Sequence, residues 1–248
     1  MKKRIVLLYH SIGKSNANDL MQLRIPKAEL QKHVDFVRLK GMKISTIEEL
    51  LSSKDDRSRV AFSFDDGYED QIQAAEILEK AGSRGTFFVI PGLFGGKMPG
   101  AGCWNRWKLM SKGKILELSA RGHEIGGHSL THPGPLDQLA PIVRRREIAC
   151  CGERLEELLG RDITGFSYPH GGISREVQRD VAEAGYRYAC CSEPGTFRPG
   201  SNLYSIPRIE VRGRDSLKTF VQKISGQGEI WRKIRHHLSR LVHGIIRE

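Results

Sequence analysis

The sequence contains no hydrophobic run long enough to cross a membrane as a helix, which takes about 20 apolar residues. The N-terminal run from Ile5 to Tyr9 stops at His10 and is too short for the apolar core of a secretory signal peptide. We therefore interpret it as a buried strand. We expect a cytoplasmic protein, with a peripheral position on the inner face of the membrane as the alternative.

Cysteine is scarce and poorly placed for a disulfide framework. Of the five cysteines, Cys150 and Cys151 are neighbours, and so are Cys190 and Cys191. Bridging two neighbours strains the peptide between them. The sequence also has no C-x-x-C pair, so a cysteine-built zinc knuckle is excluded. These absences favour a reducing compartment.

Acidic residues are outnumbered, because 40 Lys and Arg face 29 Asp and Glu. Residues 212–248 hold nine basic and three acidic residues, a surplus of 9 − 3 = 6. Apolar residues recur there at helical spacing: Ile230, Ile234, Leu238, Leu241, Val242 and Ile245. We therefore expect residues 212–248 to form a basic amphipathic helical tail. It would lie on an anionic membrane surface or pack on the preceding domain. We expect no nucleic-acid partner, since no recognised binding motif is present.

Patterns typical of strands and helices alternate over residues 1–211. Strands are expected at 5–9, 60–64, 85–90, 123–127, 163–167, 186–190 and 205–211. Helices are expected at 26–40, 46–51, 69–81, 112–121, 141–159 and 174–184. This alternation predicts an α/β domain with a mainly parallel sheet.

Polar residues follow the ends of these expected strands. His10, Asp65, Asp66, His128 and His170 each lie just beyond one. The carboxyl ends of parallel strands share one edge, and active sites of β/α barrels are built there. The sequence therefore predicts that these five side chains gather at one rim.

Two of these residues belong to a pattern typical of a metal site. His128 and His132 are four residues apart, one helical turn, so both rings can face the same way. With Asp66 they would form a set of two histidines and one carboxylate that leaves positions open for water and substrate. Asp65 diverges from Asp66 on extended backbone and is expected to act as a general base. The alternative is a surface loop with two histidines and an ordinary turn at Asp65-Asp66-Gly67.

Three motifs, in order, resemble those of the NodB-type polysaccharide deacetylases, carbohydrate esterase family 4. They are Phe64-Asp-Asp-Gly67, His128-Ser-Leu-Thr-His132 and Phe166-Ser-Tyr-Pro-His-Gly171. The resemblance implies a distorted (β/α) barrel and metal-dependent removal of N-acetyl groups. The substrate would be a GlcNAc-type unit of a polysaccharide, oligosaccharide or lipid-linked saccharide. It also implies Asp65 as catalytic base, and Asp66, His128 and His132 as ligands of Zn2+, with Co2+ or Ni2+ as alternatives.

The sequence departs from the family pattern at the arginine of the third motif, where Ser167 stands. We expect Arg208 to support the base from another strand. Leu8-Tyr-His10 resembles an early motif of the branch that acts on exopolysaccharide poly-N-acetylglucosamine. That resemblance implies His10 as the general acid that protonates the leaving amine.

The third motif also implies contacts with the substrate. Tyr168, Pro169 and His170 would supply a backbone N–H to the oxyanion and line the substrate site. Trp104, Trp107 and Tyr168 could each stack on a sugar ring, or simply pack inside the protein. Two further functions stay open: a non-catalytic carbohydrate-binding or scaffold barrel with a decayed site, and a hydrolase of a non-sugar amide on the same fold.

Overall fold

The computed structural model describes residues 3–14, 19–99, 107–198 and 200–226. Its main element is an eight-stranded sheet in which every pairing is parallel. The strands are β1 (Arg4–Tyr9), β4 (Lys43–Ser45), β5 (Arg59–Phe64), β6 (Thr86–Val89), β7 (Glu124–Gly127), β8 (Gly165–Ser167), β9 (Tyr188–Cys190) and β10 (Ile209–Glu210). Their order is β10-β1-β5-β6-β7-β8-β9, with β4 paired to β5. The predicted parallel α/β architecture is confirmed.

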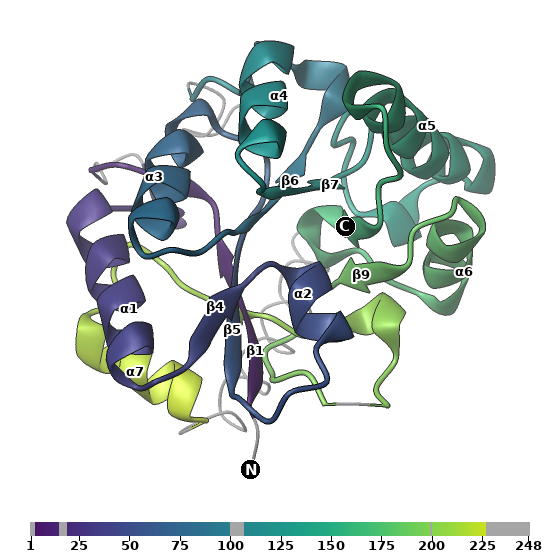
Figure 1. Cartoon of the computed structure of the whole chain (residues 1–248). Helices are drawn as coiled ribbons and strands as arrows, with labels where there is room; N and C mark the ends of the chain where they lie inside the picture. Colours follow the sequence, from purple (N-terminus) through teal and green to yellow (C-terminus); the bar gives the residue numbers. More distant parts are fainter. Residues whose placement is uncertain (1–2, 15–18, 100–106, 199, 227–248) are drawn as a thin grey trace.

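Helices surround this sheet. They are α1 (Lys27–Leu39), α2 (Ile47–Ser52), α3 (Ile72–Lys80), α4 (Lys112–Ala120), α5 (Pro141–Leu159), α6 (Arg175–Glu183) and α7 (Leu217–Ser225). Figure 1 shows α1, α3, α4, α5 and α6 around the outside of the strands. A separate two-stranded pair joins β2 (Ser11–Ile12) and β3 (Arg24–Ile25). The strands β2, β3 and β4 were not predicted, because segments of two or three residues carry no readable period.

The sheet curls into a distorted barrel. One short segment, residues 206–210, contacts both edges of the sheet, because it first bridges β9 and then pairs with β1 as β10. Ile206 bridges Cys190 of β9, and Ile209 then pairs with Leu7 of β1. This segment also carries Arg208, so the last strand lies beside the first at the closing seam.

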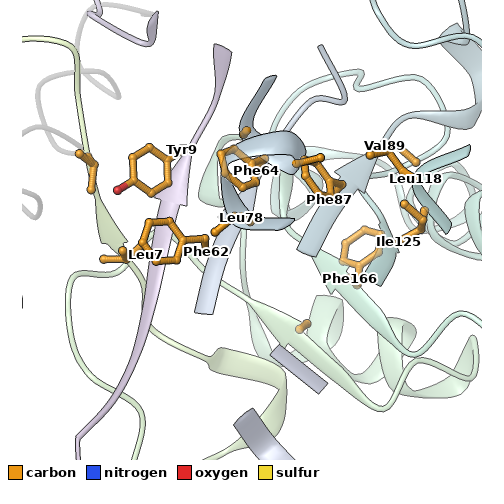
Figure 2. Close-up of a cluster of buried hydrophobic side chains, with 14 of the residues drawn as sticks. Leu7, Tyr9, Phe62, Phe64, Leu78, Phe87, Val89, Leu118, Ile125 and Phe166 are labelled. Carbon is orange, nitrogen blue, oxygen red and sulfur yellow. The ribbon is translucent and has the colours of Figure 1, made fainter. Parts of the chain in front are cut away.

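The pleat of the strands separates two apolar layers. Side chains on one parity face the helices, and Tyr9, Phe62, Phe64 and Phe87 form a continuous aromatic row there (Figure 2). Ring centroids in this row lie 4.9 Å apart for Phe64 and Phe87, and 5.4 Å apart for Tyr9 and Phe64. The opposite parity faces the inside of the barrel. That smaller cluster contains Val6, Ala61, Phe88, Tyr188, Cys190, Phe197, Ile206 and residues of α2.

One end of the barrel is closed by α2. The helix begins with a capping box, in which Thr46 accepts the N–H of Glu49 while the Glu49 carboxylate accepts the N–H of Thr46. The buried carboxylate of Glu124 accepts hydrogen bonds from Ile47 N (3.0 Å), Thr86 Oγ1 (2.6 Å) and the Tyr188 hydroxyl (2.5 Å). Burial raises the pKa of Glu124. Thr86, Glu124 and Tyr188 each begin a strand, so α2 lies at the amino-terminal end of the barrel and the carboxyl ends of the strands lie opposite.

The described part of the C-terminal tail packs on the barrel. Phe220 of α7 is buried and stacks on His33 of α1, with ring centroids 3.9 Å apart. Lys223 Nζ donates to the carbonyl of Glu210 in β10 at 2.8 Å. The amphipathic repeat of the tail, from Ile230 onward, lies outside the described residues, so its membrane contact and the boundary after Val211 stay predictions. Within the described residues, no helix combines the length and apolar character needed to span a bilayer.

Candidate active site

The site residues lie at the carboxyl ends of the strands because of the period-two pleat. Ala61 in β5 faces the barrel interior, so Ser63 and Asp65 follow on the same face. Backbone pairing fixes the heights, since Asp65 N donates to Tyr9 O and His128 N donates to Val89 O, both at 3.0 Å. Asp65 and His128 thereby meet at the rim, as the sequence predicted.

Asp66, His128 and His132 come together as predicted. One ligand atom from each lies within 4.8 Å of the other two, and all three residues are buried. Asp66 Oδ1 is 3.3 Å from His128 Nε2 and 3.6 Å from His132 Nε2. The backbone carbonyl of Ser167 accepts a hydrogen bond from His128 Nδ1 at 2.8 Å, which directs Nε2 toward Asp66. Two imidazoles and one carboxylate in this arrangement fit a divalent metal.

The electrostatics of the cluster are strongly coupled. Burial lowers the pKa of His132 to about 3, so its ring is in the neutral form that a metal ligand requires. Burial opposes the charged form of His128 as well, but Asp65 and Asp66 outweigh it and raise the pKa of that ring. Asp66 is itself ionised, because the hydrogen bond from His128 overcomes burial and lowers the pKa of its carboxyl.

The two histidines converge for a different reason from the one expected. Residues 128–132 form no helical turn. Instead Ser129 (φ 60°) and His132 (φ 57°) both adopt left-handed backbone, and His132 N donates to Ser129 Oγ at 3.0 Å. Asp66 is left-handed too, at φ 72°. Such conformations cost non-glycine residues about 1–3 kcal/mol each and collect at functional sites. The helical-spacing argument was wrong, although the pairing it predicted is present.

Asp65 is held apart from the Asp66–His128–His132 cluster, the candidate metal cluster. Arg208 donates hydrogen bonds to both carboxylate oxygens of Asp65, from Nη1 to Oδ1 and from Nη2 to Oδ2, each at 2.7 Å. Ser167 Oγ donates to Oδ2 at 3.0 Å. Burial of Asp65 opposes its charge, but Arg208 overcomes this and lowers the pKa of the carboxyl. Arg208 thus makes the contact expected of the missing motif arginine, and Ser167 joins the two halves of the site.

His10 lies beside Asp65 on the neighbouring strand end and is half-buried. After Arg208 and His128, its positive form also helps to lower the pKa of Asp65. Gln71 holds the two strand ends together, because its Nε2 donates to the carbonyls of His10 (3.0 Å) and Asp65 (2.6 Å). Sequence reasoning missed Gln71, since a single glutamine at the start of a helix carries no motif.

The third motif divides into a buried part and an exposed part. The ring of Tyr168 is 1 % exposed, and its hydroxyl donates to Tyr204 O at 2.9 Å. Its backbone N–H is donated to Cys190 O, and Pro169 has no N–H. His170 is exposed, left-handed at φ 54°, and its ring centroid is 4.5 Å from that of His132. His170 thus presents its ring beside His132, whereas the Tyr168 hydroxyl is directed to Tyr204.

Two of the three aromatic residues considered for sugar stacking are described by the structure, and both are packed inside the protein. Trp107 is 8 % exposed and meets Tyr68 edge-on, with centroids 5.2 Å apart. Tyr168 belongs to the outer apolar layer. Trp104 lies outside the described residues. The packing alternative therefore describes Trp107 and Tyr168.

Known proteins share the fold of this chain. A poly-beta-1,6-N-acetyl-D-glucosamine N-deacetylase of Staphylococcus aureus is 20 % identical, over 90 % of this chain and 83 % of its own length. The Streptococcus pyogenes deacetylase PplD superposes with a TM-score of 0.77 at 21 % identity, covering 90 % of this chain and 98 % of that one. IcaB from Ammonifex degensii gives a TM-score of 0.74 at 21 % identity, covering 94 % and 98 %. These likenesses confirm the distorted barrel.

The sequence profile of the polysaccharide deacetylases matches residues 52–189, more than half of the chain. The match includes Asp65, Asp66, His128, His132 and His170. His10 and Arg208 fall outside it, although the fold brings Arg208 onto Asp65. The chain is therefore a hydrolytic enzyme that belongs to the polysaccharide deacetylase family.

Proposed function

We propose that this enzyme hydrolyses the acetamide of N-acetylhexosamine units, of the GlcNAc type, in a glycan. The observation that carries the proposal is that two neighbouring carboxylates have different partners. Asp66 lies with His128 and His132, while Asp65 is held by Arg208 and Ser167. The relatives named as poly-beta-1,6-N-acetyl-D-glucosamine N-deacetylases support a β-linked N-acetylglucosamine polymer as the substrate class.

Asp66, His128 and His132 would hold a divalent cation, Zn2+ in the first place and Co2+ or Ni2+ as alternatives. When bound, such an ion supplies Lewis acidity, which polarises the amide carbonyl and lowers the pKa of coordinated water. The burial of one ionised carboxylate together with two imidazoles supports this assignment.

Asp65 would take the proton of the attacking water. The carboxylate is ionised, fixed in orientation by two hydrogen bonds from Arg208, and does not share the metal cluster. A base needs a defined position as much as a suitable pKa, and the Arg208 fork supplies it. As the oxygen of water bonds to the carbonyl carbon, Asp65 receives the proton released.

His10 would protonate the nitrogen of the leaving amine as the C–N bond breaks. Its place beside Asp65 at the end of β1 puts an acid and a base on adjacent strands. His170 would contact the substrate, through its backbone N–H toward the developing oxyanion or through its exposed ring. Acetate and a free amino sugar are the products.

The glycan could be a polymer, an oligosaccharide or a saccharide carried on a lipid. We propose that the basic tail brings the enzyme to an anionic membrane face, on the cytoplasmic side, where it would act on a lipid-linked saccharide. The basic composition of residues 212–248 supports this. A non-sugar amide is the second candidate substrate, favoured only by the generality of the chemistry.

Acetate release across a panel of substrates tests the proposal. The panel holds β-1,6- and β-1,4-linked N-acetylglucosamine oligomers, a lipid-linked N-acetylated saccharide and a simple acetamide without a sugar. Each is assayed with metal-loaded enzyme, with chelated enzyme, and after Zn2+ is restored. We expect acetate from at least one N-acetylated saccharide, loss on chelation and recovery with Zn2+. Turnover of the non-sugar amide alone, or chelator-resistant turnover, would contradict the proposal.

A further inference from the structure

Glu147 of α5 is buried, at 7 % exposure, although the chemistry proposed above does not use it. Its Oε2 accepts the backbone N–H of Thr131 at 2.8 Å, and its Oε1 accepts the Thr131 hydroxyl at 2.8 Å. Its own backbone carbonyl accepts the N–H of Leu130 at 2.9 Å. Three hydrogen bonds thus join one residue of α5 to the loop between His128 and His132.

The other side of this loop is held just as closely. The carbonyl of Leu130 accepts the N–H of Gly92 at 2.8 Å. A Cβ at Gly92 would lie only 2.3 Å from that carbonyl oxygen, so this approach requires glycine. The loop is therefore clamped between Glu147 of α5 and the short turn Pro91–Leu93.

These contacts from Glu147 and Gly92 lie in a stretch of unfavourable backbone conformation. Ser129 and His132, on either side of Leu130 and Thr131, are both left-handed. Non-glycine residues keep such a conformation only when the surrounding contacts determine it. Thr131 directly precedes His132, so holding Thr131 at both its N–H and its hydroxyl restricts where the backbone of His132 lies.

We propose that Glu147 is a positioning residue for the metal cluster: through Thr131 it sets the place of His132 relative to His128 and Asp66. The inference rests on the proposed function, because the position of His132 matters to function only if the cluster binds a cation. A merely structural role, anchoring α5 to the barrel, would alter the free energy of unfolding but leave the metal affinity of the folded protein unchanged.

A double-mutant cycle on the full-length protein separates these roles. The dissociation constant for Zn2+ is measured by competition with a chromophoric chelator for wild type, Glu147→Ala, Thr131→Val and the double variant. Partners that orient metal ligands typically contribute about 10- to 100-fold in affinity. Because Glu147 acts one residue away from the ligand, we expect Glu147→Ala to weaken binding about tenfold. The double variant should be no weaker than Glu147→Ala, since both changes remove the same contact.

Two further variants sharpen the result. Glu147→Gln should bind nearly as wild type, because its amide oxygen can accept the Thr131 N–H while its nitrogen donates to the hydroxyl. Glu153→Ala, on an exposed position of the same helix, should bind as wild type. Circular dichroism at the assay temperature establishes that each variant is folded.

The outcomes are distinct. If folded Glu147→Ala binds Zn2+ as tightly as wild type, Glu147 is structural only and the inference is overturned. If Glu147→Ala does not fold, Thr131→Val decides: about threefold weaker binding supports the inference, and unchanged binding overturns it. Absence of Zn2+ binding by wild type would defeat the proposed function and this inference with it, a result different from either of the others.

Discussion

Arg208 and Asp65, which are 143 positions apart in the chain, form a bidentate ion pair. Arg208 is 1 % exposed, and its guanidinium also donates to Ser167 Oγ (2.9 Å) and to the carbonyl of Cys191 (3.1 Å). The arginine enters from the last strand of the barrel, across the closing seam. With a further hydrogen bond to Ser63 Oγ (3.3 Å), five hydrogen bonds hold the guanidinium against Asp65, the carboxylate that lies outside the Asp66–His128–His132 set.

Replacing Arg208 with lysine should impair turnover while leaving the metal site loaded. Lysine keeps the positive charge but presents one ammonium group instead of a planar fork, so Asp65 loses one of two fixed contacts. A small misplacement of a catalytic group can reduce the rate by about 100-fold, and we expect kcat to fall by about 10- to 100-fold. Acetate release gives kcat, and metal analysis gives occupancy.

The matched control is Arg212→Lys, whose side chain pairs with Glu210 nearer the surface. It should retain wild-type kcat. Wild-type kcat for Arg208→Lys would mean that Asp65 needs no orienting fork.

The sequence predicted much of this site because its residues follow strand ends in recognisable motifs. Asp66, His128 and His132 were identified as a set, and the pleat then places them on one rim. Arg208 could be suggested only as a substitute for the missing arginine, since pairing between strands far apart leaves no local trace. Glu147 was not predicted at all: a glutamate within a helix looks like surface charge until the neighbouring loop is seen.

Asp65 and His128 should respond differently to substitution, although both belong to the same site. Asp65→Asn removes the base but none of the three cluster ligands, so it should keep Zn2+ and lose about 100- to 10,000-fold in kcat. His128→Ala removes a ligand and should lose both metal and turnover. Metal analysis of purified variants, with acetate release, separates the two. Full activity in either variant would contradict the role assigned to that residue.

His10→Gln should lower kcat with little effect on metal content. Glutamine keeps the size of the side chain but cannot deliver a proton to the leaving amine at neutral pH. We expect kcat to fall by about 100-fold for an N-acetylated sugar. An acetate ester with a good leaving group does not need the acid, and its hydrolysis should be affected much less. Equal losses on the amide and the ester would indicate that His10 is structural.

Phe220→Ala should destabilise the whole domain, because α7 closes part of the outer apolar layer. Truncating a buried phenylalanine costs about 3–5 kcal/mol, and Phe220 is fully buried against His33 and Phe36. Denaturant unfolding gives the difference in free energy. Lys218→Ala, exposed on the same helix, is the control. A loss below about 1 kcal/mol would show that α7 is loosely attached.

His33 should make the protein lose stability as the pH falls below neutrality. The ring is buried between Tyr9, whose hydroxyl lies 3.2 Å from Nδ1, and Phe220. Burial lowers the pKa of His33 to about 4, more than the nearby acids Glu29 and Asp215 raise it. Between about pH 6.5 and pH 4, the His33 ring therefore binds a proton in the unfolded chain but not in the folded protein. The free energy of unfolding falls over that window, by about 2 kcal/mol at pH 4.5. Above pH 7 the titration of His33 has no effect on it.

The variant His33→Gln removes this titration while keeping an acceptor for the Tyr9 hydroxyl. Urea unfolding at several pH values should give a wild-type free energy that falls more steeply than that of the variant between pH 6.5 and pH 4.5. Lys32→Gln, which removes a neighbouring charge at the exposed surface of α1, should leave most of the slope in place. Parallel curves for wild type and His33→Gln would mean that His33 accepts its proton without unfolding, and that the contact between α1 and α7 tolerates a buried imidazolium.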